Sequence, residues 1–232
     1  MRVLHLISGG DSGGAKTHVL SLLRDLNDNI DADLVCYMEA DFSKEAREMG
    51  IPTRVFPGSF GVGLKKTREA IENGNYDIIH CHGARGNLMG NLIKKHLGAP
   101  VVTTVHSDYR LDYLGRPVAR LSYGTTNMVA LRRVNFYIGV SDPMTDILIE
   151  RDFPADRIYT IYNGIDFKTP IQTVPKEEFL KSVGMEWEPG DVIAGIAVRL
   201  SPVKDVPTLL RAMKIACAQN PRLKLLIGGD GE

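Results

Sequence analysis

The sequence has too few cysteines for a disulfide framework or a cysteine-rich zinc site. Its three cysteines, Cys36, Cys81 and Cys217, lie far apart, are odd in number and form no CxxC pair. Such sparse cysteines suit a reducing compartment, so we expect a cytoplasmic location.

The chain also lacks net charge and long apolar runs. Its 28 basic residues balance 28 acidic ones, whereas proteins that bind a nucleic-acid backbone usually carry a basic excess. Nucleic acid is therefore not an expected partner. No run approaches the ~18 apolar residues of a membrane-spanning helix, and the apolar run near the N-terminus breaks into glycines too early for a signal peptide. We expect a soluble protein without a membrane span.

Positive charge is concentrated in one part of the chain. Eight lysines and arginines but only two acidic residues, Asp108 and Asp112, fall between His80 and Arg133. This excess has two interpretations: separate solvated helix faces, or a surface that meets an anionic acceptor or lipid headgroups. The second interpretation predicts peripheral contact with the inner face of a membrane.

Short β-branched runs alternate with amphipathic helical patterns along the chain. Strands are predicted at 2–7, 32–38, 53–57, 77–82, 100–106, 135–140, 157–162, 191–198 and 223–229, and helices at 15–26, 41–50, 64–74, 86–98, 116–133, 142–152 and 205–220. Ser141 is expected to cap the helix at 142–152, which has a proline just inside its start. This alternation predicts βαβ units, hence an α/β fold with a doubly wound, Rossmann-like parallel sheet.

The alternation is interrupted once, which predicts two domains. Residues 1–168 form the first Rossmann-like domain, the proline-bearing polar stretch 169–188 is a linker, and 189–232 begin a second Rossmann-like domain with a strand that we expect to be buried. A single β-α-β arrangement is too small to enclose a core of its own. We therefore expect an incomplete second domain and a chain that is a fragment of a longer protein.

A glycine-rich loop follows the first strand, with four glycines (Gly9, Gly10, Gly13 and Gly14) in six positions. It misses the Walker A pattern by one residue in either register, and it does not have the G-x-G-x-x-G spacing of a dinucleotide site. Strand, glycine turn and helix N-terminus together still suit an anion, because free N–H groups and the positive end of the helix dipole meet there. The alternative is a tight turn without a ligand.

Histidines end two of the predicted strands. His80 and His82 are two residues apart and share one face of a strand, and His106 ends the next strand. The carboxyl edge of a parallel sheet is where ligands bind, so these histidines could hold a metal or simply line a cleft. No carboxylate or cysteine is placed as a further ligand, since Cys81 faces the other side of its strand; the sequence favours no metal.

Six segments taken together resemble family 4 glycosyltransferases over the whole chain. They are SGGAKTHVL, DIIHCHGARGNLMGNL, VVTTVHSD, IGVSDPMTDIL, IYTIYNGID and AVRLSPVKDVPTLLRAM. The most specific are the NGID turn and the Arg-Leu-x-Pro-x-Lys run. The resemblance implies the GT-B architecture, in which two Rossmann-like domains face each other across a cleft.

The resemblance also implies roles for individual residues. His106 matches the catalytic histidine that reaches the donor sugar near the reacting carbon. Arg199 and Lys204 match the basic pair that binds the donor diphosphate, and Gly13 and Gly14 match the glycine loop that approaches the same diphosphate. The positions expected to line the acceptor side of the cleft are His18, His82, Ser141 and Asn163. Lys16 is expected to face solvent.

The implied activity is transfer of a sugar from a nucleotide-diphosphate sugar to a sugar or lipid-linked acceptor, with retention at the anomeric carbon and without a metal or other cofactor. The family's two glutamates, seven residues apart, have no match in the chain, and Glu232 belongs to no such pair. We therefore expect the fragment to transfer sugar weakly or not at all. Two alternatives stay open: a nucleotide-sugar epimerase or hydrolase of the same architecture, and a non-catalytic sugar- or lipid-binding module.

Overall fold

The computed structural model describes residues 1–10, 13–26, 29–94, 98–112, 124–165 and 173–231. The chain divides into two compact units, Met1–Ile165 and Asp166–Glu232. Helix α8 (Lys176–Ser182) lies inside the range predicted as a linker. Part of that range, 169–172, is outside the described residues, so the linker remains a prediction.

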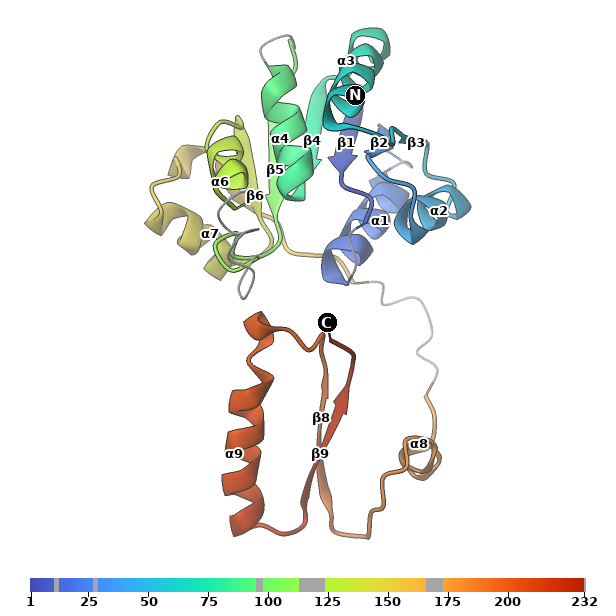
Figure 1. Cartoon of the computed structure of the whole chain (residues 1–232), viewed down its shortest axis with the longest axis vertical. Helices are drawn as coiled ribbons and strands as arrows, with labels where there is room; N and C mark the ends of the chain where they lie inside the picture. The colour runs from blue at the N-terminus through green and yellow to red at the C-terminus, as the bar shows by residue number, and fades with distance from the viewer. Residues whose placement is uncertain (11–12, 27–28, 95–97, 113–123, 166–172, 232) are drawn as a thin grey trace. The chain divides into compact units, whose positions relative to one another are not determined.

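The first unit is built on a seven-stranded, wholly parallel sheet with the order β3-β2-β1-β4-β5-β6-β7 (Figure 1). Its strands are β1 (Arg2–Ile7), β2 (Asp31–Cys36), β3 (Thr53–Val55), β4 (Ile78–His82), β5 (Val101–Val105), β6 (Phe136–Gly139) and β7 (Ile158–Thr160). The predicted α/β class and Rossmann-like parallel sheet are confirmed.

Helices connect these strands. They are α1 (Gly14–Leu26), α2 (Asp41–Glu48), α3 (Phe60–Gly74), α4 (Gly83–Ile93), α6 (Thr125–Leu131), α7 (Asp142–Glu150) and the short 3-10 helix η3 (Ala155–Arg157). Of the helix predicted at 116–133, residues 116–123 lie outside the described residues. The predicted cap of α7 is confirmed, because Ser141 Oγ accepts a hydrogen bond from the backbone N–H of Met144 at 3.3 Å.

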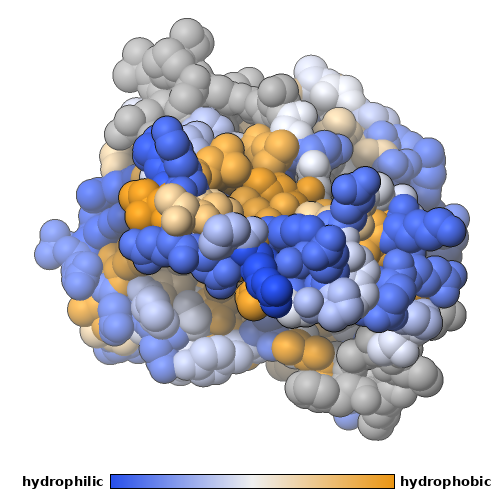
Figure 2. Space-filling model, turned by 90° about the horizontal axis from the view of Figure 1, so that it is seen from below, coloured by the Kyte–Doolittle hydropathy of each residue, from blue (hydrophilic) through white to orange (hydrophobic). Residues whose placement is uncertain are grey.

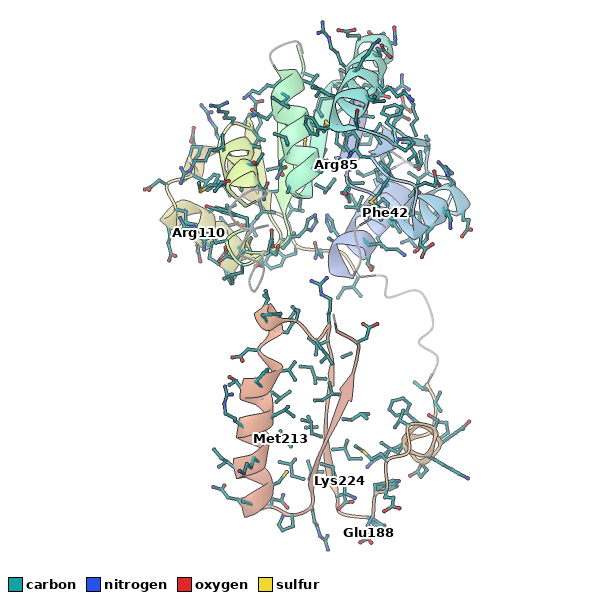
Figure 3. All side chains as sticks on the ribbon, in the orientation of Figure 1. Phe42, Arg85, Arg110, Glu188, Met213 and Lys224 are labelled. Carbon is teal, nitrogen blue, oxygen red and sulfur yellow. The ribbon has the colours of Figure 1, made fainter. Side chains whose placement is uncertain are left out.

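Two hydrophobic cores cover the two faces of the sheet. One core contains side chains of α3, α4, α6 and α7, including Ile71, Met89, Leu131 and Leu148. The other contains side chains of α1 and α2, including Phe42, which Figure 3 labels. The sheet is therefore doubly wound, and its central strands are buried on both faces.

Helix α4 approaches the sheet closely because of two glycines one helical turn apart. A Cβ built at Gly86 would overlap the backbone carbonyl oxygen of Leu6 on β1, and one at Gly90 would overlap the sulfur of Cys81 on β4. The helix can lie directly on the strands only because these positions carry no side chain.

Substituting Gly86 with alanine should destabilise the first unit. The new methyl group has no free space against the β1 backbone, so the helix must move away, at a cost of about 1–3 kcal/mol in the free energy of unfolding. Urea denaturation measures the change. Gly61→Ala is the matched control because a Cβ there contacts nothing within 4 Å. Equal midpoints for both variants would contradict the close approach.

The second unit is a smaller β-α-β arrangement. It contains α8, β8 (Val192–Ala197), the 3-10 helix η4 (Pro202–Lys204), α9 (Val206–Gln219) and β9 (Leu223–Gly228), and β8 pairs in parallel with β9. Lys224 ties the strands together through an ion pair with Asp191 at 2.7 Å. Figure 3 labels Lys224 on the sheet and Glu188 in the segment that precedes β8.

The prediction that the strand at 191–198 is buried is wrong. Val192 is 54% exposed and Ile196 36% exposed, and no residue of α9 is buried. A two-stranded sheet with one long helix has too few neighbours to cover its apolar side chains. Figure 2 shows hydrophobic side chains among hydrophilic ones on the face of the protein seen from below. Among the described residues, no helix is both long and apolar enough to span a bilayer.

Candidate functional site: a histidine cluster at the strand-order reversal

The strand order of the first unit reverses between β1 and β4. These strands are neighbours in the sheet, and the helices that follow them, α1 and α4, contribute to different cores. In an open parallel sheet this arrangement leaves a crevice at the carboxyl ends of the strands, where ligands bind. The arrowheads of β1 and β4 mark this edge in Figure 1.

Five histidines gather at this reversal, and we call them the histidine cluster: His5, His18, His80, His82 and His106. His5 comes from β1, His80 and His82 from β4, His18 from α1, and His106 follows the last residue of β5. His5, His80 and His82 are at most 8% exposed, whereas His18 and His106 are half-buried. The cluster therefore extends from the interior of the sheet to the surface at its carboxyl edge.

The rings of the cluster stack and are hydrogen-bonded to one another. His80 and His82 have ring centroids 4.3 Å apart. His82 Nε2 lies 3.0 Å from His5 Nδ1, and His82 Nδ1 lies 3.4 Å from His106 Nε2. His80 Nε2 lies 2.8 Å from Thr104 Oγ1, which comes from β5. Two ring nitrogens, His5 Nε2 and His18 Nε2, are buried and have no partner among the described residues.

Burial keeps the histidine cluster uncharged. Loss of hydration lowers the pKa of His5 to about 3 and that of His106 to about 4. Burial also lowers the pKa values of His80 and His82 well below the ordinary value, and the neighbouring histidines lower them further. At neutral pH these four side chains are therefore neutral imidazoles, each with one N–H donor and one acceptor nitrogen.

The inner histidines meet one requirement of a metal site. His5, His80 and His82 each offer a ring nitrogen, and these atoms lie within 4.8 Å of one another. However, His82 uses both nitrogens in bonds to other histidines, and its ring lies parallel to that of His5, 9° between planes, rather than pointing to a shared centre. The geometry fits a hydrogen-bonded stack better, and the absence of a metal remains a prediction.

The glycine loop leads into α1 beside this cluster. Gly13 has a φ of +67°, and a Cβ at either Gly13 or Gly14 would contact nothing within 4 Å. The backbone here is exposed and unobstructed, which suits an anion at a helix N-terminus. The loop lysine Lys16, which was expected to face solvent, is partly exposed and forms an ion pair with Glu45 of α2.

The other predicted residues of the first unit lie in different environments. Burial lowers the pKa of His18, and a side-chain hydrogen bond to Asn163 opposes this effect. This hydrogen bond places Asn163, which is exposed, next to His18. Ser141 caps α7, and His82 is only 1% exposed. His82 therefore reaches the edge of the sheet through His106 rather than directly.

Arg199 and Lys204 lie in the second unit. Arg199 follows β8, and Lys204 ends η4, with Asp205 between it and α9. Both are exposed, and neither forms an ion pair with a carboxylate among the described residues. An exposed lysine without an ion pair among the described residues, next to the N-terminus of a fourteen-residue helix, suits an anionic ligand.

The described part of the basic stretch has structural contacts of its own. Lys94 Nζ donates to the carbonyl of Arg133 at 2.7 Å, and the guanidinium of Arg132 donates to the carbonyl of Arg151 at 2.6 Å. Arg85, labelled on α4 in Figure 3, lies 5.0 Å over the ring of Tyr37. A surface for an anionic acceptor or lipid headgroups therefore remains a prediction.

Sequence reasoning missed His5, which is the innermost member of the cluster. A histidine in the middle of an apolar strand was a weak signal, and it became informative only when β1 paired with β4 and put His5 opposite His80. It also missed the ion pair of Arg151 with Asp108, at 2.5 and 2.6 Å, which fixes the segment after β5 against the end of α7.

Comparison with known proteins decides the family. The family model described as Glycosyltransferase Family 4 matches residues 12–169, more than half of the chain. The chain belongs to this family. The matched range holds most of the site described above, including the glycine loop from Gly13, four members of the histidine cluster, and Asn163.

Curated relatives agree with the family. A D-inositol 3-phosphate glycosyltransferase of Thermobispora bispora is 24% identical over 250 residues, covering 93% of this chain and 55% of the relative. D-inositol 3-phosphate glycosyltransferase 2 of Catenulispora acidiphila is 26% identical over 258 residues, covering 98% of this chain and 59% of the relative. The chain thus spans little more than half the length of these family members.

Solved structures agree with the fold. HepE of Anabaena, crystallised in complex with UDP-glucose, has a TM-score of 0.76 and 21% sequence identity, covering 99% of this chain and 61% of HepE. At this sequence identity, the structural similarity to HepE supports a GT-B-type, Rossmann-like fold for this chain.

Proposed function

We propose that this family 4 glycosyltransferase chain serves a retaining transfer of a sugar from a nucleotide-diphosphate donor to a hydroxylated acceptor. The observation that carries the proposal is the place of His106: a neutral imidazole, half-buried at the carboxyl edge of β5, in contact with His18 of α1 in a glycosyltransferase fold. A neutral donor at such an edge can hydrogen-bond a sugar hydroxyl or a charge that develops during transfer.

The donor's diphosphate is assigned to backbone and cationic groups. In the first unit, Gly13 and Gly14 offer unhindered backbone at the start of α1. In the second unit, Arg199 and Lys204 are exposed cations without an ion-pair partner among the described residues. Fixed cations can stabilise a nucleoside diphosphate leaving group without a metal, which is the arrangement that we propose. His18, Asn163 and the capped turn at Ser141 are proposed to contact the acceptor, with His82 supporting them from the interior.

Uridine diphosphate is the first probe because HepE was crystallised with UDP and with UDP-glucose. We expect the 232-residue chain to bind UDP in calorimetry, and Lys204→Ala to weaken this affinity by about 10-fold or more, since a hydrogen bond to a charged group contributes about 1.5–3 kcal/mol. Lys214→Ala is the matched control, because Lys214 is an exposed lysine of α9 without an ion-pair partner among the described residues.

The outcomes separate the candidate functions. Failure to bind any nucleoside diphosphate would overturn the proposal and favour a binding module. Transfer is then followed with UDP-glucose in the complete protein, with and without D-inositol 3-phosphate, the compound named in the curated relatives. Release of UDP or a change of the sugar that needs no acceptor would favour a hydrolase or an epimerase.

A further inference from the structure

We infer that His82 is a positioning residue that fixes which ring nitrogen of His106 carries the proton, through a hydrogen-bonded series that starts at His5. The inference rests on the proposed function only for the role of His106 as a hydrogen-bond donor in sugar transfer. The arrangement of protons belongs to the ligand-free fold and can be measured without any substrate.

Both ring nitrogens of His82 are hydrogen-bonded to other histidines. Its Nε2 pairs with His5 Nδ1 at 3.0 Å, and its Nδ1 pairs with His106 Nε2 at 3.4 Å. A neutral imidazole has one N–H and one lone pair. A ring that uses both nitrogens must therefore donate to one neighbour and accept from the other, so the two bonds run in the same direction along the series.

Burial removes the charged alternative. His5 is fully buried with a pKa of about 3, and His106 has a pKa of about 4. None of the three rings is then an imidazolium near neutral pH, and none can donate from both nitrogens. Only two arrangements of protons remain for the series.

The environment of His5, at the inner end of the series, distinguishes the two arrangements of protons. If His106 donated from Nε2, His82 would donate from Nε2 to His5, and the His5 proton would sit on its Nε2. That nitrogen is buried and has no partner among the described residues. Orphaned buried N–H groups are rarer in folded proteins than acceptors with an unused lone pair. The series therefore runs outward, with a proton on the Nδ1 atom of each of the three rings.

This direction leaves His106 with a defined donor. Its Nε2 accepts from His82, and its Nδ1–H is available at the carboxyl edge of the sheet. Free imidazole side chains in water favour the proton on Nε2, so the series reverses the ordinary preference. A histidine held in this tautomer can donate a hydrogen bond from Nδ1 to a sugar hydroxyl or to the departing oxygen without first gaining a proton.

The stacked rings hold His82 in place for this purpose. His82 lies parallel to His5 and 4.3 Å from His80. His80 has the same burial and the same strand, but it bonds to Thr104 and takes no part in the series. It is therefore the natural control position.

Nitrogen-15 spectroscopy of the histidine-labelled 232-residue chain tests the inference. Long-range proton–nitrogen correlations distinguish protonated from bare ring nitrogens. We expect the proton of His106 on Nδ1 in the unmodified chain. In His82→Phe, which keeps a stacking ring but no nitrogen, the proton should move predominantly to Nε2. His80→Phe should leave the tautomer of His106 unchanged.

Each contrary result overturns the inference. A proton on Nε2 of His106 in the unmodified chain does so by itself, so the test does not depend on whether a variant folds. An unchanged His106 spectrum in folded His82→Phe also does so. Added Zn²⁺ should leave the signals of the cluster in place; selective shifts at His5, His80 and His82 would assign a metal site instead.

A comparison of kcat between two His106 variants adds a measurement that would not change if the hydrogen-bonded series had only a structural role. In the complete protein, His106→Asn keeps an amide N–H near the position of Nδ1, and His106→Gln keeps one near Nε2. We expect at least a 10-fold higher kcat for the asparagine variant. If the proton of His106 is on Nδ1 but the chain binds no nucleotide, only the proposed function is refuted. If the protein transfers sugar but the proton of His106 is on Nε2, only the hydrogen-bonded series is refuted.

Discussion

Replacing His106 with alanine in the complete protein is expected to lower kcat for sugar transfer by about 10²–10³-fold, while UDP affinity changes little. Removing one fixed donor that faces a developing charge has this magnitude in other enzymes. His106 is suited to that task because burial holds its pKa at about 4, so the same neutral donor is present throughout the neutral pH range.

Initial-rate kinetics with a nucleotide-sugar donor, together with UDP calorimetry, measure this effect. His80→Phe is the control, since it removes an imidazole of the same cluster that contacts Thr104 rather than His106. Turnover of His106→Ala within a few-fold of the unmodified protein would contradict the assignment. Weaker UDP affinity with an unchanged kcat would instead place His106 in ground-state binding.

The free energy of unfolding is expected to fall steeply as pH drops from 7.5 to 5.5. His5, His80, His82 and His106 have depressed pKa values in the folded chain, whereas in the unfolded chain they titrate near 6.5. The unfolded state therefore takes up protons first. Stability is fully present above pH 6.5 and is lost as pH falls toward the folded pKa values.

The expected loss over this interval is roughly 1 kcal/mol for each of the four histidines, or about 4 kcal/mol together. Urea denaturation at pH 7.5, 6.5 and 5.5 measures it in a range where most carboxylates stay ionised. His80→Phe should remove about a quarter of the pH dependence. A midpoint that is constant over the interval would mean that these histidines titrate normally in the folded chain.

Local patterns predicted the elements of this fold well. Alternating β-branched runs and amphipathic segments correctly located the described strands and most helices, and Ser141 caps α7 as its residue type indicates. Period-two alternation put His80 and His82 on one face and Cys81 on the other, since the cysteine lies in the core with α4. The pattern failed for β8, which was predicted to be buried but has no buried residue. Burial depends on the elements that pack against a strand, and the strand's own sequence does not specify them.

Local spacing along the chain was enough to predict the fold class, the family resemblance and the candidate residues at strand ends. The tertiary structure decided how these candidates act together. His5 and His80 are 75 positions apart and become neighbours only because β1 pairs with β4 across the order reversal. His82 lies behind His106 because β4 pairs with β5, and Lys16 pairs with Glu45 because α1 and α2 lie on the same face of the sheet. Hydrogen bonds between side chains of non-consecutive strands depend on sheet order and register, which local spacing does not encode.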